Sequence, residues 1–213
     1  MSKFLEKFGK GGNLISYIKA SNPDTRGNEL DSLIDHSHPE VRGAAILHDN
    51  ILDSTLKRAL THKDDSIKIA AARNKKLSNN NLDIAVNHTD SSVRAASAQN
   101  PNLSKEHLDK LVNDESAFVR KTVASHQKIT SEHINKLLND TDYGVLSKVV
   151  KHKYTPTEKL DQFITHRDPD VREAVANNQN VSKEQLIKLS KDRYEYVKDA
   201  AKRNLKGLDN VSR

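Results

Sequence analysis

The sequence predicts an all-α protein, a solenoid of about seven to eight stacked repeats that each contain two short helices. The first supporting observation is a hydrophobic residue followed by a basic one, which recurs every 26 residues without insertion. These pairs are Val41-Arg42, Ile67-Lys68, Val93-Arg94, Val119-Arg120, Val171-Arg172 and Val197-Lys198, with Val145-Leu146 filling the remaining place. The second observation is a hydrophobic content of only 35%, which suits a thin core shared between stacked repeats.

Numbering each repeat from its Val or Ile places further residues in columns. Position 16 is Leu30, Leu56, Leu82, Leu108, Ile134, Leu160 and Leu186. Position 11 is Ile51, Leu77, Leu103, Ile129, Thr155 and Val181. Position 8 is Asn22, His48, Asn74, Asn100, His126, His152, Asn178 and Asn204, so an incomplete first repeat begins near Ile15.

Each repeat is expected to open with a helix that has a capping residue at its N-terminus. The caps are Asp64, Asp90, Asp142 and Asp168, whose carboxylates can accept from free backbone N–H groups. Pro169 suits the first helical position. Small residues such as Ala70-Ala71-Ala72 let neighbouring helices approach closely. We expect this helix to end at position 8, because Asn and His tolerate the left-handed conformation of a helix end.

The second helix of each repeat is predicted to begin at Ser78, Ser104, Thr130 or Ser182 and to run for about nine residues. Its apolar residues at positions 16, 19 and 20 have helical spacing, as in Leu108, Leu111 and Val112. Isolated helices of this length are marginal in water, so each must bury its apolar face against the neighbouring repeats.

The segment from Asp168 to Asp192 resembles the leucine-rich repeat variant family, and more loosely the HEAT and armadillo superfamily. The resemblance covers about residues 15–205 and rests on the pattern D-x-x-V-R…A…N…L-S-x-E-x-L-x-x-L. It implies a right-handed superhelix in which one helix of each pair can be a 3₁₀ turn. It implies little about function, since such repeats serve many partners. The iron–sulfur cluster that accompanies one member's repeats requires cysteines, and this sequence has none.

Three regions are expected along the chain. Residues 1–14 form an N-terminal helical cap or tail, residues 15–205 form the repeats, and residues 206–213 form a basic C-terminal tail. In the first region Phe4, Leu5 and Phe8 share one helical face. Because terminal repeats need something to cover their exposed core, we interpret this segment as a cap rather than a docking or membrane-surface helix.

Composition and motifs exclude several classes of function. The absence of cysteine excludes disulfides and a cysteine nucleophile. The chain has neither a run of about 18 to 20 apolar residues nor the apolar core of a signal peptide, so a cytoplasmic location is expected. No phosphate-binding loop, dinucleotide fingerprint or zinc-protease motif is present. We therefore expect a protein that is not an enzyme and that uses no cofactor and no small-molecule substrate.

The histidines do not suggest a metal site. Most fall in position 8 or position 22, and stacked repeats hold such columns about 10 Å apart. Zinc needs its ligands about 2 Å from one centre. HEAT-like DNA glycosylases share the expected architecture but depend on aromatic side chains that include Trp, which is absent here.

The basic residue at position 2 has two possible roles. It could form a ladder that binds phosphate, or it could pair with acidic residues in the turns between helices. Suitable acids lie at Asp114, Asp140 and Asp192. We favour structural pairing.

The net charge of +6 is concentrated at the ends of the chain. Residues 1–26 and 197–213 each contribute +3, and the body between them is neutral. Within the repeats, positions 6–10 gather basic residues together with Asn and Gln, which suit phosphate contacts. The candidate partner or phosphate contacts are Arg73, Lys75, Lys76, Lys128, Lys148, Lys151, Lys153, Tyr154, Lys202, Arg203 and Lys206.

Two functional hypotheses follow. The first is a non-enzymatic scaffold that binds a macromolecular partner, with another protein favoured over other classes. The alternative is sequence-nonspecific binding of nucleic acid, chiefly DNA, through the basic edge and the basic termini. The repeat that starts at Val145 departs most from the pattern, with Leu146 in place of the Arg and a basic, aromatic turn at Lys151–Tyr154. It is either a drifted repeat or a partner-contact site.

Overall fold

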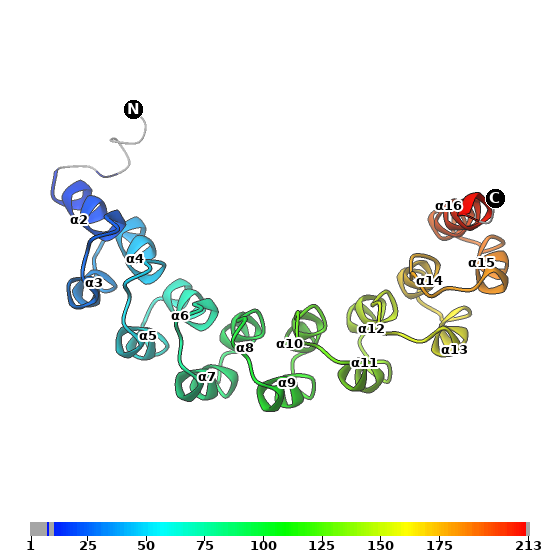
Figure 1. Ribbon diagram of the computed structural model, residues 1–213, viewed down its shortest axis with the longest axis horizontal. Coiled ribbons are helices and arrows are strands. Elements are labelled where there is room, and N and C mark those ends of the chain that lie inside the picture. Colours follow the sequence, from blue (N-terminus) through cyan, green and yellow to red (C-terminus); the bar gives the residue numbers. More distant parts are fainter. Residues whose placement is uncertain (1–7, 9–10, 212–213) are drawn as a thin grey trace. The chain divides into compact units, whose positions relative to one another are not determined.

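The computed structural model describes residue 8 and residues 11–211, with side chains described as far as residue 208. Within these residues the regular structure is α-helical throughout, apart from one 3₁₀ turn, and contains no strand. The chain divides into two compact units, Met1–His107 and Leu108–Arg213. Each unit consists of stacked two-helix repeats (Figure 1), which confirms the predicted fold class.

The first helices of the repeats are called A helices here. In the first unit they are α2 (Gly12–Ser21), α4 (Pro39–Ile46), α6 (Asp65–Arg73) and α8 (Ser91–Ser97). In the second unit they are α10 (Ala117–Val123), α12 (Tyr143–Val150), α14 (Pro169–Ala176) and α16 (Glu195–Val211). In each unit successive A helices pack against one another, as α6 does against α8 and α12 against α14.

The second helices, or B helices, lie along the other side of each unit (Figure 1). They are α3 (Gly27–Leu33), α5 (Asp53–Ala59), α7 (Asn79–Val86), α9 (Lys105–Leu111), α11 (Ser131–Leu137), α13 (Thr157–Leu160) and α15 (Lys183–Leu189). The division between the two units falls within α9. Among the described residues a 3₁₀ turn occurs at η1 (Asp161–Phe163), directly after α13, so the other B helices do not follow the 3₁₀ geometry that the resemblance allowed.

The two ends of the chain differ in how far they are described. Of the predicted N-terminal cap, Phe4 and Leu5 lie outside the described residues, whereas Phe8 is buried and its ring lies 4.7 Å from that of Tyr17. At the other end, α16 continues as a helix to Val211, through most of the segment assigned to a C-terminal tail.

The predicted caps are confirmed on both kinds of helix. The carboxylates of Asp64, Asp90, Asp142 and Asp168 accept hydrogen bonds from backbone N–H groups in the first turns of α6, α8, α12 and α14. The hydroxyl groups of Ser78, Thr130 and Ser182 do the same for α7, α11 and α15. The core between these helices is thin, and its buried aliphatic residues include those of positions 1 and 16.

The left-handed conformation predicted for position 8 is wrong. Asn22 and Asn74 end their helices with φ of −76° and −67° and an extended ψ. The side chain of position 8, not its backbone, completes the helix end of the preceding repeat. The amide of Asn178 donates to the carbonyl oxygens of Val150 at 2.5 Å and His152 at 3.0 Å, and its Oδ1 accepts from the N–H of Asn180. The last carbonyl groups of a helix lack hydrogen-bond donors within the helix, and the amide of Asn178 provides the missing donors.

Histidine replaces asparagine in this column because the ring offers equivalent atoms. In His48, Nδ1 accepts from the N–H of Asn50 at 2.9 Å, and Nε2 lies 2.8 Å from the carbonyl oxygen of Asn22. A neutral imidazole with its proton on Nε2 therefore provides one acceptor and one donor, as the amide does. Within each unit, hydrogen bonds of this column connect neighbouring repeats, as at Asn74, Asn100 and Asn178.

The predicted pairing of the position 2 arginines is confirmed in two repeats. Arg120 and Arg172 form bidentate pairs with Asp140 and Asp192, with nitrogen–oxygen distances of 2.6 to 2.9 Å. Each arginine also donates to two carbonyl oxygens of the loop before its own helix. Where Leu146 replaces the arginine, His166 occupies the place of the acid. These arginines therefore hold the turns between repeats rather than forming a ladder for phosphate.

We predict that Asn178→Asp lowers the free energy of unfolding by about 2 kcal/mol. The substitution keeps the size and the acceptor but removes the donor from two buried carbonyl oxygens. Asn178→His is the matched control, since histidine already occupies this column, and it is expected to cost less than about 1 kcal/mol. Urea unfolding of the purified chain measures both values. Equal losses would contradict a hydrogen-bonding role.

We also predict that the protein loses stability as the pH falls from about 4 towards 2. Hydrogen bonds from Ser66 and Arg42 lower the pKa of the Asp64 carboxyl from 3.8 to about 2, and Arg172 lowers the pKa of Asp192. Because the folded-state pKa lies below the unfolded value, this stabilisation is complete above the unfolded pKa and is lost on acidification. Urea unfolding at a series of pH values measures it.

The Arg172→Met variant tests whether the lowered pKa of the Asp192 carboxyl contributes to this loss of stability. It should lower the stability at neutral pH by about 3 kcal/mol, because it leaves the buried Asp192 carboxylate without its partner. Its unfolding free energy should then depend less on pH in the acid range. The exposed Lys191→Met is the control and should follow the parent chain. An unchanged pH dependence in Arg172→Met would contradict the assignment.

Candidate interaction surface

One side of the A helices carries exposed side chains, such as those of Leu47, Lys148 and Arg203, beside the buried alanines Ala95, Ala96, Ala174 and Ala200. It consists of positions 3, 4 and 7 of each repeat, which neighbour one another on a helix. We call this surface the A face. In the first unit its residues are Tyr17, Ile18, Ser21, Gly43, Ala44, Leu47, Ile69, Ala70, Arg73, Ala95, Ala96 and Gln99. In the second unit they are Lys121, Thr122, Ser125, Ser147, Lys148, Lys151, Glu173, Ala174, Asn177, Asp199, Ala200 and Arg203. The first set is mainly apolar or small, and half of the second set is charged.

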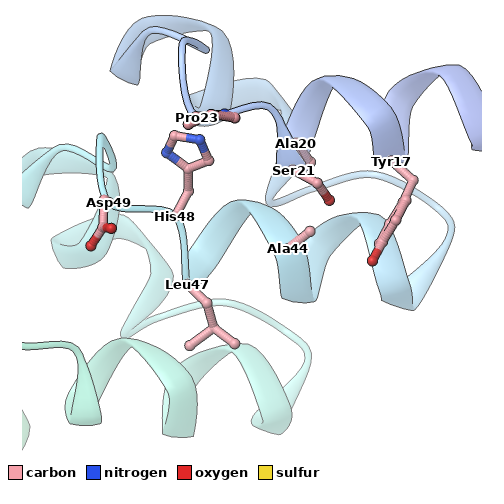
Figure 2. A pocket seen from close by; sticks show the side chains of 8 residues that line it. All are labelled: Tyr17, Ala20, Ser21, Pro23, Ala44, Leu47, His48 and Asp49. Carbon is pink, nitrogen blue, oxygen red and sulfur yellow. The ribbon is translucent and has the colours of Figure 1, made fainter.

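A depression of about 380 Å³ lies on the A face of the first unit, between α2 and α4 (Figure 2). Its lining residues are Tyr17, Ala20, Ser21, Pro23, Ala44, Leu47, His48 and Asp49. Leu47 is 69% exposed and Ile18, on the same face, is 58% exposed. His48 lies below Pro23 and uses both ring nitrogens in bonds to the backbone. The depression is therefore suited to apolar contact rather than to proton transfer.

A second depression, of about 430 Å³, lies on the A face of the second unit, across α10, α12 and α14. Its lining residues are Lys121, Ser147, Lys148, Lys151, Asp170, Glu173, Ala174 and Asn177. The three lysines form no ion pair within the described part of the chain. On α14, Asp170 accepts from the hydroxyl of Tyr196 at 2.9 Å, and Glu173 accepts from the amide of Asn177 at 3.3 Å.

Two groups near this second depression have shifted pKa values. Burial, followed by repulsion from Lys153 and Lys148, lowers the pKa of His152. Burial, followed by the hydrogen bond to the Asp170 carboxylate, raises the pKa of Tyr196 to about 12. The charged neighbours are thus lysines at His152 and acids at Tyr196.

All the basic and aromatic contact residues proposed from the sequence are exposed. In the first unit, Lys75 pairs with Asp49 at 3.3 Å, while Arg73 and Lys76 form no ion pair with any described residue. In the second unit, the structure brings Lys148 and Lys151 together at the second depression. The other predicted residues of that unit lie elsewhere on its surface: Lys128, Lys153, Tyr154, Lys202, Arg203 and Lys206.

Lys121, Asp170 and Glu173 were not predicted from the sequence. Along the two edges of the repeat these charges do not stand out, whereas positions 26, 3, 4 and 7 share one helix face. That helical spacing is the signal that could have found them.

The asparagines of the basic edge do not serve as free phosphate ligands, contrary to the expectation from the sequence. The amide nitrogens of Asn50, Asn102 and Asn180 donate to backbone carbonyl oxygens of the preceding repeat. Those turn carbonyls have no partner within their own helix, so the amides stabilise the turn and are occupied.

A further polar column on the B helices was also missed. Position 15 bonds to the acid at position 17 of the preceding repeat, as His133 does to Asp109 at 2.8 Å and Gln185 to Asp161 at 3.1 Å. The same side chains accept from the backbone N–H groups of the helix caps Thr130 and Ser182. These histidines are therefore structural.

The described residues show two further absences. No group of three or more His, Asp or Glu side chains within them is placed to hold a metal ion. Likewise, none of the described helices combines the length and the apolar character needed to cross a membrane.

Comparison with known proteins supports the fold. No family model matches the sequence, and no curated protein matches it. The solved structure of a leucine-rich repeat variant, described as having a novel repetitive structural motif, is similar over 92% of this chain and 77% of that chain. Its TM-score is 0.66 and its sequence identity is 23%, which confirms the predicted resemblance at the level of the fold.

Two engineered proteins are similar over 92% and 97% of this chain and over 95% and 77% of their own, each with 17% identity. Their TM-scores of 0.33 and 0.36 are too low to support an argument.

Proposed function

We propose that this chain is a non-enzymatic helical-repeat scaffold that binds another protein through its A face. The observation that carries the proposal is that the side chains which connect the repeats differ from those exposed on the A face. The residues that most resemble catalytic groups, such as His48 and His133, are engaged in bonds between repeats. The A face keeps exposed side chains, apolar at Leu47 and charged at Lys148 and Lys151, around two depressions.

Nucleic-acid binding is the second candidate function. It is favoured by exposed basic residues at the ends of the A helices, including Arg73, Lys76 and Lys151, which have no acidic partner among the described residues. The acids Asp170 and Glu173 beside the lysines weaken it, because they would repel a phosphate backbone. The occupied asparagines weaken it further.

The test compares capture of proteins by the parent chain and by two variants with matched charge changes. The A-face variant carries Leu47→Glu, Lys148→Glu and Lys151→Glu. The control carries Ile84→Glu, Lys136→Glu and Lys188→Glu on exposed positions of the B helices. We expect a protein that is retained by the parent and the control and is lost from the A-face variant. Circular dichroism and thermal unfolding establish that all three are folded.

A different outcome of this test would contradict the scaffold proposal. If no protein depends on the A face while the purified chain binds duplex DNA or RNA, the scaffold proposal fails and the second candidate is supported. That binding should weaken by orders of magnitude as salt rises from about 50 to about 200 mM. It should also fall when Lys75, Lys76, Lys151 and Lys153 become Glu.

A further inference from the structure

The second depression places opposite charges on separate helices. Lys121 extends from α10, and Lys148 and Lys151 belong to α12 and its C-terminal end, whereas Asp170 and Glu173 belong to α14. The ammonium group of Lys121 lies near Gly144, at the start of α12, as does the carboxylate of the cap Asp142. We call this arrangement the charge-split depression.

The two sets of charges do not neutralise each other. None of the three lysines forms an ion pair with a described carboxylate. Asp170 is held by the hydroxyl of Tyr196 and Glu173 by the amide of Asn177, so both carboxylates are oriented without a cation. Burial is the main cause of the shifted pKa values of His152 and Tyr196, and the charged neighbours that add to it are lysines at His152 and acids at Tyr196.

The spread of the charges sets the size of a suitable partner. Packed helices stand about 8 to 10 Å apart, so a line from α10 across α12 to α14 covers about 16 to 20 Å. An extended chain covers about 3.3 Å per residue, which makes this the length of about five or six residues. A small zwitterion is too short to contact the charged side chains of all three helices at once.

We propose that the charge-split depression binds an extended segment of a partner protein whose acidic residues face Lys121, Lys148 and Lys151 and whose basic residue faces Asp170 and Glu173. This inference rests on the proposed function and names the chemistry of the partner. A uniform polyanion, including a protein segment that is acidic throughout, fits less well, because Asp170 and Glu173 repel it.

The experiment measures fluorescence anisotropy with a labelled split-charge peptide, Glu-Glu-Glu-Gly-Ser-Lys-Lys, and with the same residues in reverse order. An alternating peptide, Glu-Lys-Glu-Gly-Ser-Lys-Glu, and a free Glu-Lys dipeptide are the comparison probes. At about 50 mM salt we expect one direction of the split-charge peptide to bind about tenfold more tightly than the alternating peptide. The free dipeptide should not compete.

Two pairs of substitutions test the lysines of α12 and the carboxylates of α14 separately. Lys148→Glu with Lys151→Glu should weaken the split-charge peptide about tenfold and create binding of an all-lysine peptide. Asp170→Lys with Glu173→Lys should weaken it similarly and create binding of an all-glutamate peptide and of single-stranded DNA. Asp170→Asn with Glu173→Gln serves if the lysine pair disturbs the start of α14. The matched control, Lys136→Glu with Lys188→Glu on the B helices, should bind like the parent.

Several outcomes would overturn the inference. These are failure of both directions of the split-charge peptide to bind at about millimolar concentration, equal binding of the alternating peptide, or competition by the dipeptide. Capture of a partner protein that depends on Leu47 but not on the charged residues of the charge-split depression would refute this inference and leave the proposed function standing. DNA binding by the parent chain, with no protein captured, would refute both.

Discussion

The fold depends on how the free carbonyl groups at the ends of the A helices are satisfied. At five of these ends the next repeat donates the hydrogen bonds, through the Asn or His at position 8: His48, Asn74, Asn100, Asn178 and Asn204. Asn178 reaches Val150 and His152, and Asn204 reaches Ala176. Since each of these bonds spans 26 to 28 residues, an inserted residue would move the amide away from its acceptor. This constraint accounts for the strict repeat length better than the apolar core does, because aliphatic contacts tolerate small shifts.

Two other polar connections support the same register. Arginine at position 2 pairs with the acid at position 22, and position 15 bonds to the acid at position 17 of the preceding repeat. The repeat that starts at Val145 lacks the first of these connections, since it has Leu146 and His166 in the two places. The repeat is still joined to the next one, because Asn178 donates to the carbonyl oxygens of Val150 and His152.

Much of this fold could be predicted from the sequence, because capping and periodic burial are local properties. Asp64 and Ser78 are recognisable as caps from the residues that follow them, and Asp192 is recognisable as a partner for Arg172 from its column. The role of Asn178 could not be recognised, since a helix-ending asparagine is usually explained by its own backbone. The charge-split depression was only partly predicted. Lys148 and Lys151 were identified, but Lys121 and Glu173 join them through the packing of three helices, which no column expresses.

The connections between repeats also have a consequence for the order in which the chain folds during synthesis. The side-chain hydrogen bonds of positions 8, 10 and 15 reach back 24 to 28 residues, from Gln185 to Asp161 at the short end and from Asn178 to Val150 at the long end. Such contacts are close in sequence, so closing them costs little chain entropy. A repeat that emerges from the ribosome already has its acceptors in place on the repeat before it. The chain can therefore acquire its structure one repeat at a time, before its C-terminal half exists.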